Sequence, residues 1–177
     1  MSKRAIVLIG CAGSGKSTMG KLLADVSNGT YISTGDIARR MEAVGLYDST
    51  TGKLAPERLM RMCLEEDLDN ASDVVILDGF PRTVAQARYL ETIVDTIDVI
   101  MLNISREEAT SRLIARGRKD DTKENIERRM ERYFDSINSI LAFIMDSDIN
   151  GAYKNVMSAE SDATLTQAVK IWEKLNN

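Results

Sequence analysis

Short apolar runs alternate along the chain with longer segments in which apolar residues recur every three or four positions. The short runs predict strands, and the segments with helical periodicity predict helices. The predicted strands are Ala5–Ile9, Thr30–Ser33, Val74–Leu77, Val99–Ile104 and, with a weaker pattern, Ala152–Met157. The predicted helices begin at Lys16, near Asp36, at Pro56, near Thr83 and at Arg106, followed by two more over Thr122–Ile144 and Thr164–Leu175. This alternation is typical of βαβ units, so we expect an α/β fold with a parallel sheet.

The two C-terminal helices carry continuous apolar stripes, which we interpret as core-facing rather than as part of a cofactor site. The stripes are Ile126, Met130, Phe134, Ile137, Leu141 and Ile144 in the first helix, and Leu165, Ala168, Val169 and Trp172 in the second. Ser105 with Glu108 has the spacing of a helix capping box, and so does Asp121 with Glu124. No linker or repeat interrupts the pattern, so we expect one domain over residues 1–177, with its most mobile loop at Gly45–Lys53.

The overall charge and the cysteine content exclude several classes of protein. The formal net charge is −4, so the chain has no excess of positive charge with which to bind nucleic acid broadly. Its two cysteines, Cys11 and Cys63, do not have the spacing of a zinc site or a disulfide framework. The apolar run that follows Arg4 ends at Gly10, too soon for a signal peptide, and no run approaches the length of a membrane span. We therefore expect a cytoplasmic protein that binds neither nucleic acid nor membrane.

The chain contains no histidine. This absence excludes Ser-His-Asp triads, Cys-His pairs and phosphohistidine chemistry. Catalysis must then rely on carboxylates, lysine, arginine, backbone dipoles and a hard metal ion. Phosphoryl transfer is a reaction that such groups can support.

A phosphate-binding motif follows the first predicted strand, over Gly10-Cys11-Ala12-Gly13-Ser14-Gly15-Lys16-Ser17-Thr18. It fits the pattern G-x-x-x-x-G-K-[ST], in which backbone N–H groups and a helix N-terminus surround phosphate groups. Lys16 would reach the outer phosphates, and the Ser17 hydroxyl would coordinate Mg²⁺. The alternative is a glycine-rich turn with a chance lysine.

Further polar segments follow other predicted strands and the helix after the fourth strand. They are Tyr31-Ile32-Ser33-Thr34-Gly35-Asp36-Ile37-Ala38-Arg39, Ile76-Leu77-Asp78-Gly79-Phe80-Pro81-Arg82-Thr83-Val84-Ala85-Gln86, and Arg116-Gly117-Arg118-Lys119-Asp120-Asp121 with Arg129. Ligands of open α/β sheets bind at the carboxyl ends of the strands. We therefore expect these segments to converge on the phosphate-binding loop.

Together these motifs resemble the adenylate kinase-type nucleoside monophosphate kinases, from Ala5 into the C-terminal helix. The resemblance implies a P-loop NTPase fold with a five-stranded parallel sheet flanked by helices on both faces. It also implies MgATP as donor, AMP as acceptor, ADP as product and Mg²⁺ as cofactor. The acceptor-binding insertion would span about 34–63, and a minimal lid about 116–121. A monomer is expected, with oligomers left open.

The resemblance also implies roles for individual residues. The catalytic residues would be Lys16, Arg82, Arg118 and Arg129. ATP would be bound by Gly10, Ala12, Gly13, Ser14, Gly15, Lys16, Ser17, Thr18, Arg116 and Arg118. AMP would be bound by Thr34, Gly35, Arg39, Gly79, Arg82, Gln86 and Arg129. The metal would be held by Ser17 and, through water, by Asp78 and Asp36.

Some of these residues also have simpler interpretations. Arg39 could pair with Glu42 on a helix surface. Asp36 could serve merely as a helix-start residue, and Asp121 could be the N-cap of the following helix. The chain also departs from the family pattern, with Ala12 in place of the usual proline and only Gly117 between the two donor-side arginines. We therefore expect no separate subdomain to fold over the donor.

Three other functions fit the same motifs. The chain could be a kinase for UMP, CMP or deoxynucleoside monophosphates. It could be a P-loop kinase with a hydroxyl acceptor, in which Asp36 would be the base. It could also be a nucleotide-gated binding or scaffold protein with a degenerate site.

Overall fold

The computed structural model describes residues 3–48, 55–146, 152–161 and 163–177. Its centre is a parallel sheet of five strands in the order β2-β3-β1-β4-β5. The strands are β1 (Arg4–Ile9), β2 (Thr30–Ser33), β3 (Val74–Asp78), β4 (Thr96–Asn103) and β5 (Tyr153–Glu160). The five predicted strands are thus confirmed, although β4 begins three residues before the predicted start and β5 ends three residues beyond the predicted end.

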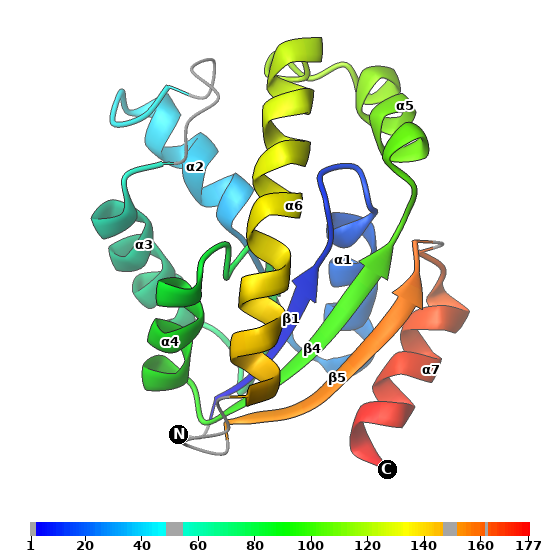
Figure 1. Ribbon diagram of the computed structural model, residues 1–177. Coiled ribbons are helices and arrows are strands. Elements are labelled where there is room, and N and C mark those ends of the chain that lie inside the picture. The colour runs from blue at the N-terminus through cyan, green and yellow to red at the C-terminus, as the bar shows by residue number, and fades with distance from the viewer. Residues whose placement is uncertain (1–2, 49–54, 147–151, 162) are drawn as a thin grey trace.

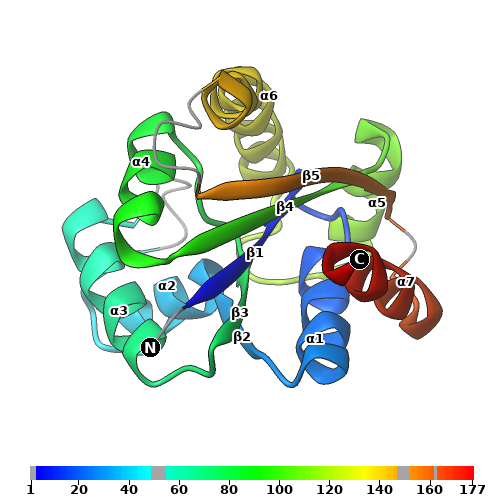
Figure 2. The ribbon, with the colours of Figure 1, turned by 90° about the horizontal axis from the view of Figure 1, so that it is seen from below.

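Helices cover both faces of the sheet, as Figures 1 and 2 show. The helices are α1 (Lys16–Ser27), α2 (Thr34–Ala43), α3 (Glu57–Asp69), α4 (Val84–Ile93), α5 (Arg106–Arg116), α6 (Lys123–Asp146) and α7 (Leu165–Asn176). The apolar core against α2, α3, α4 and α6 lies on one face, and the core against α1 and α7 lies on the other. A third apolar cluster joins the phosphate-binding loop to α5 and α6.

Several helix starts follow from capping groups read in the sequence. Ser105 Oγ accepts a hydrogen bond from the backbone N–H of Glu108 at 3.1 Å, as predicted for α5. Helix α2 begins at Thr34, two residues before the predicted position, because Ser33 provides its N-cap. The predicted mobile loop Gly45–Lys53 lies partly outside the described residues, since 49–53 are not described.

Three residues of the predicted core stripes are exposed instead. Phe134 on α6 is 45% exposed, and Leu165 and Val169 on α7 are 57% and 37% exposed. Helix α7 turns Ala168, Ile171 and Leu175 toward the sheet, so Leu165 and Val169 fall beside that buried face. The prediction was wrong here because a wide apolar stripe does not show which of its edges meets the sheet.

The predicted capping box at the start of α6 was also wrong. The hydroxyl of Thr122 accepts the hydrogen bond from the N–H of Asn125, at 3.3 Å. Asp121 instead binds arginine side chains, which are described below. None of the helices in the described ranges is long and apolar enough to cross a membrane.

Candidate nucleotide site

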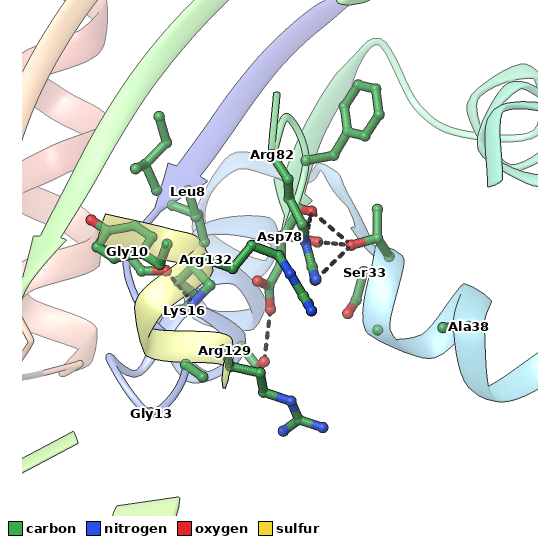
Figure 3. A pocket seen from close by; sticks show the side chains of 18 of the residues that line it. Leu8, Gly10, Gly13, Lys16, Ser33, Ala38, Asp78, Arg82, Arg129 and Arg132 are labelled. Atoms are coloured by element: carbon green, nitrogen blue, oxygen red, sulfur yellow. Dashed lines mark hydrogen bonds between the residues drawn. The ribbon is translucent and has the colours of Figure 1, made fainter. Parts of the chain in front are cut away.

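The phosphate-binding loop connects β1 to α1 and bends back around the Lys16 ammonium group. Gly13 and Gly15 adopt left-handed conformations, with φ of 85° and 83°. Lys16 Nζ donates to the carbonyl oxygens of Gly10 and Cys11, each at 2.8 Å (Figure 3). Enclosure by protein lowers the pKa of Lys16; the Asp78 carboxylate offsets part of this effect, and the nearby Arg82 lowers the pKa further. The ammonium therefore lies where an anionic ligand would be stabilised.

Tight packing fixes the loop against α5. A Cβ atom on Gly13 would lie 2.5 Å from the carbonyl oxygen of Ala109 on that helix. Cys11 packs in the same apolar cluster as Leu113 on α5 and Met130 on α6. The donor side of the site is thus held directly by the helices that precede and follow the predicted lid.

Asp78 ends β3 beside the loop and is 6% exposed. Its Oδ2 atom accepts hydrogen bonds from Ser17 Oγ at 2.7 Å and from Tyr31 Oη at 2.6 Å. A hydroxyl and a carboxylate are oxygen donors of the kind that Mg²⁺ prefers. These groups therefore fit a magnesium site at the start of α1.

Thr34, Gly79 and Arg82 meet where β3 ends and α2 begins. The Thr34 hydroxyl donates to the Gly79 carbonyl at 2.9 Å, and Arg82 Nε donates to the same oxygen at 2.7 Å. Gly79 has φ of 83°, and a Cβ there would lie 2.5 Å from Thr34 Oγ1. The close approach leaves room only for glycine, and it places the Arg82 guanidinium beside Asp78 (Figure 3).

Gln86 is 7% exposed on the first turn of α4. Its Oε1 accepts a hydrogen bond from the backbone N–H of Arg82 at 2.7 Å. Its amide therefore both lines the cavity and fixes the segment that carries Arg82. Met60, Phe80 and Ile140 give this part of the cavity an apolar lining suited to a flat ring.

On α2, Arg39 lines the cavity and forms an ion pair with Asp36. The Asp36 side chain is 58% exposed and is not among the residues that line the cavity in the described chain. Asp36 therefore has Arg39 as its partner and is not part of the cavity lining to which Ser17 and Asp78 belong.

Asp121 is the centre of a charged network between α5 and α6. Arg116 donates to its two carboxylate oxygens at 2.9 and 2.7 Å, and Arg129 donates to it at 3.2 Å and also to Asp120. Burial raises the pKa of Asp121, but the hydrogen bonds and charges of Arg116, the Arg118 N–H and Arg129 outweigh it and hold the pKa below its usual value. Asp121 thus positions the arginines of the predicted lid.

These groups surround a cavity of about 830 Å³ at the carboxyl ends of the strands. The predicted residues that line it are Gly10, Ala12, Gly13, Gly15, Lys16, Ser17, Thr18, Thr34, Gly35, Arg39, Asp78, Gly79, Arg82, Gln86, Arg116, Arg118 and Arg129. Ser14 does not line it, because its side chain is fully buried and packs against Gly10. The lining has nine basic and three acidic residues, in a chain whose net charge is −4. This concentration of positive charge favours a polyanionic ligand.

Sequence reasoning missed several residues that line this cavity or contact Asp78. Arg112 lines it near Gly15 and donates to the Ser161 carbonyl at 3.3 Å. Arg132, Tyr47 and Tyr133 also line it, and Tyr31 reaches Asp78 from β2. For Arg112 and Arg132 the available signal was helical spacing, since they lie four residues before Arg116 and three after Arg129.

Comparison with known proteins connects this geometry to a family. Residues 8–149 match the family model described as adenylate kinase. An adenylate kinase from Corynebacterium aurimucosum is 36% identical, with 81% of this chain and 93% of that protein covered. Those from Nostoc sp. (adenylate kinase 1) and Mycobacterium sp. are 38% and 39% identical, covering 72% and 77% of this chain and 77% and 83% of theirs. The chain belongs to the adenylate kinase family.

Proposed function

We propose that this nucleoside monophosphate kinase transfers the γ-phosphoryl group of MgATP to AMP and forms two molecules of ADP, reversibly. The observation that carries the proposal is a continuous, strongly basic cavity that joins the phosphate-binding loop to the Gly79–Arg82 segment. One end of the cavity has the geometry of a triphosphate site. The other combines arginines with an apolar recess and the Gln86 amide.

On the donor side, backbone N–H groups of Gly10–Thr18 bind the phosphates, and Lys16 turns from the loop carbonyls to the outer phosphates. Arg118 covers the phosphates. Arg116, predicted to bind ATP, uses its guanidinium for two bonds to Asp121. We assign the base contact to Arg112, whose exposed guanidinium lies beside Gly15.

Mg²⁺ would be held by the Ser17 hydroxyl and, through water, by Asp78. When bound, the cation neutralises phosphate charge and orients the phosphate oxygens. The exposure of Asp36 and its pairing with Arg39 do not support its predicted role as a third metal-site residue.

On the acceptor side, Arg39, Arg82 and Arg129 grip the phosphate of AMP. A planar guanidinium pairs with two phosphate oxygens at once, which a lysine does not do. Thr34, Gly35 and Gly79 shape the pocket where the base enters, and the Gln86 amide contacts the adenine. The Gln86 oxygen retains a second lone pair after accepting from Arg82, so its amide can both donate to and accept from the base.

The reaction requires no general base, because the attacking group is already an anionic phosphate oxygen. Catalysis is then alignment of two anions and neutralisation of the charge between them. Lys16, Arg82, Arg118 and Arg129 provide that positive charge. Closure of the acceptor side excludes water and suppresses hydrolysis of ATP.

The proposal includes the regions and the setting expected from the sequence. One domain over 1–177 contains an acceptor-binding region of about 34–63, of which 49–54 lie outside the described residues, and a minimal lid of about 116–121. We further propose a cytoplasmic monomer that binds neither nucleic acid nor membrane.

A coupled assay of ADP formation, with and without AMP, tests the function directly. Fast turnover that requires both AMP and Mg²⁺ is the expected result. Better turnover with UMP, CMP or dAMP would reassign the acceptor. Turnover with a hydroxyl acceptor alone would contradict the proposal, and no turnover with any acceptor would favour a binding protein.

A further inference from the structure

Tyr31 contacts the proposed metal site but has no role in the steps above. Its hydroxyl donates to Asp78 Oδ2 at 2.6 Å, and the Ser17 hydroxyl donates to the same atom at 2.7 Å. Tyr31 belongs to β2, Asp78 ends the neighbouring strand β3, and Ser17 lies in the first turn of α1. Three segments that are distant in the sequence therefore meet at one carboxylate oxygen.

The Tyr31 ring is held in place by the backbone of α1. A Cβ atom on Gly20 would lie 2.5 Å from Cε2 of the ring, so the ring lies directly against the helix. The ring also packs against the apolar core between the sheet and α1. The position of the hydroxyl is thus fixed by packing within the protein, independently of any ligand.

The two hydroxyl groups have different capacities at a metal site. A serine hydroxyl can donate its proton to Asp78 and still offer a lone pair to a cation. The Tyr31 hydroxyl donates its proton to the carboxylate and lies beside the Ser17 and Ser33 hydroxyls, and Tyr31 does not line the cavity. Within the described part of the chain, both hydroxyls bind Oδ2, and no hydrogen bond is made to Oδ1. This arrangement fixes the rotation of the carboxylate and leaves Oδ1 for water molecules of a hydrated cation.

We propose that Tyr31 is a positioning residue for the divalent cation and acts through Asp78. It orients the carboxylate and does not touch the nucleotide. Groups that orient metal-site ligands in this way contribute substantially to metal affinity. The inference rests on the proposed function in one respect, because the cation is expected to enter together with the donor nucleotide.

The test compares two phenylalanine variants by isothermal titration calorimetry. Tyr31→Phe removes the hydroxyl and keeps the ring against Gly20. Tyr153→Phe is the matched control, because its hydroxyl donates to the Ala87 carbonyl at 3.2 Å and Tyr153 does not line the cavity. Adenylyl imidodiphosphate, an ATP analogue with a non-hydrolysable γ-phosphate, is titrated into each protein in excess Mg²⁺ and in EDTA. The dissociation constant in EDTA divided by the dissociation constant in Mg²⁺ is the ratio that measures what the cation contributes to binding.

In Tyr31→Phe, we expect the ratio to fall by about tenfold while the dissociation constant in EDTA is unchanged. Tyr153→Phe should keep the wild-type ratio. If Tyr31→Phe weakens binding of the analogue equally with and without Mg²⁺, the ratio is unchanged, Tyr31 has a structural role only, and the inference is overturned. An unchanged ratio with no weakening at all would overturn it too, and so would wild-type binding that does not depend on Mg²⁺. A wild-type chain that does not bind the analogue at all would instead refute the proposed function.

Discussion

Charged side chains gather at both ends of the sheet, but the two groups are built differently. At the amino-terminal end, Arg4 donates to Asp98 at 2.7 Å, to the Asn176 side chain and to the Leu175 carbonyl. Asp98 is 1% exposed and also accepts from Asn155 at 2.6 Å. At the carboxyl end, basic residues outnumber acidic ones nine to three around the cavity.

This difference distinguishes charged groups that stabilise the fold from charged groups that are available to bind a ligand. The Arg4–Asp98 cluster finds its partners within the protein and ties α7 to β1 and β4. The surplus of cations around the cavity costs stability through mutual repulsion, and a bound polyphosphate would relieve it. Asp121 is intermediate, because it pairs with cavity arginines and still leaves the surplus in place.

The largest effect is expected from removing a single cation at the carboxyl end. Lys16→Ala and Arg82→Ala should each lower kcat by roughly 10²–10³, because each removes a preorganised charge from the transferred group. Steady-state kinetics with ATP and AMP measure this loss, and melting temperatures should change little. Lys21→Ala, an exposed lysine on the same helix as Lys16, is the control. Near-full turnover in Arg82→Ala alone would show that the acceptor phosphate was assigned wrongly.

The opposite pattern is expected at the amino-terminal end. Asp98→Ala leaves Arg4 without its buried partner and should lower the free energy of unfolding by about 2–3 kcal/mol, less than for a fully buried pair because Arg4 is 24% exposed. The melting temperature should fall by about 4–12 °C, with kcat almost unchanged. Asp25→Ala on the exposed side of α1 is the control, followed by the same thermal melts. A loss of kcat without a loss of stability would remove the distinction between the two ends.

A smaller effect is expected at the acceptor base. Gln86→Ala should weaken the preference for AMP over other monophosphates by about 1–3 kcal/mol, because polar groups of the base lose their partners. The ratio of kcat/KM values for AMP and its competitors measures this. Gln167→Ala is the control, since Gln167 holds the equivalent capped position on α7. An unchanged ratio would place the base elsewhere in the cavity.

The smallest effect concerns the donor base. Stacking on an arginine carries little information about base identity, so GTP, CTP and UTP should replace ATP at modest cost. Initial rates with each triphosphate at fixed AMP test this expectation. A preference for ATP above about a hundredfold, some 2.7 kcal/mol, would contradict it, because such discrimination needs directed hydrogen bonds.

Local patterns in the sequence were sufficient for most of the fold. The strands, the phosphate-binding loop and the α5 cap depend on neighbouring residues, and the structure confirms them. The early start of β4 was missed because Asp98 reads as a polar break in the sequence. Its burial depends on Arg4, 94 residues away, which no local pattern shows.

The parts of the site that depend on packing between distant segments could not be predicted. Tyr31 read as an ordinary strand residue, because its contact with Asp78 depends on the pairing of β2 with β3 and on the space above Gly20. Asp121 read as a helix cap, because its arginine partners are brought to it only by the folding of α5 against α6. The assignments of individual residues to nucleotide groups remain predictions.

Gly117 offers an opportunity for protein engineering. It is exposed, and a Cβ atom there would meet nothing closer than the Ile114 carbonyl at 4.0 Å. Asp121 holds Arg116 and the Arg118 N–H on either side of it. A foreign segment inserted at this turn would begin and end at residues that Asp121 already holds close together. The entropic cost of closing a longer loop rises only slowly with its length. The position is therefore a natural graft point for a reporter or an enlarged cover over the donor nucleotide.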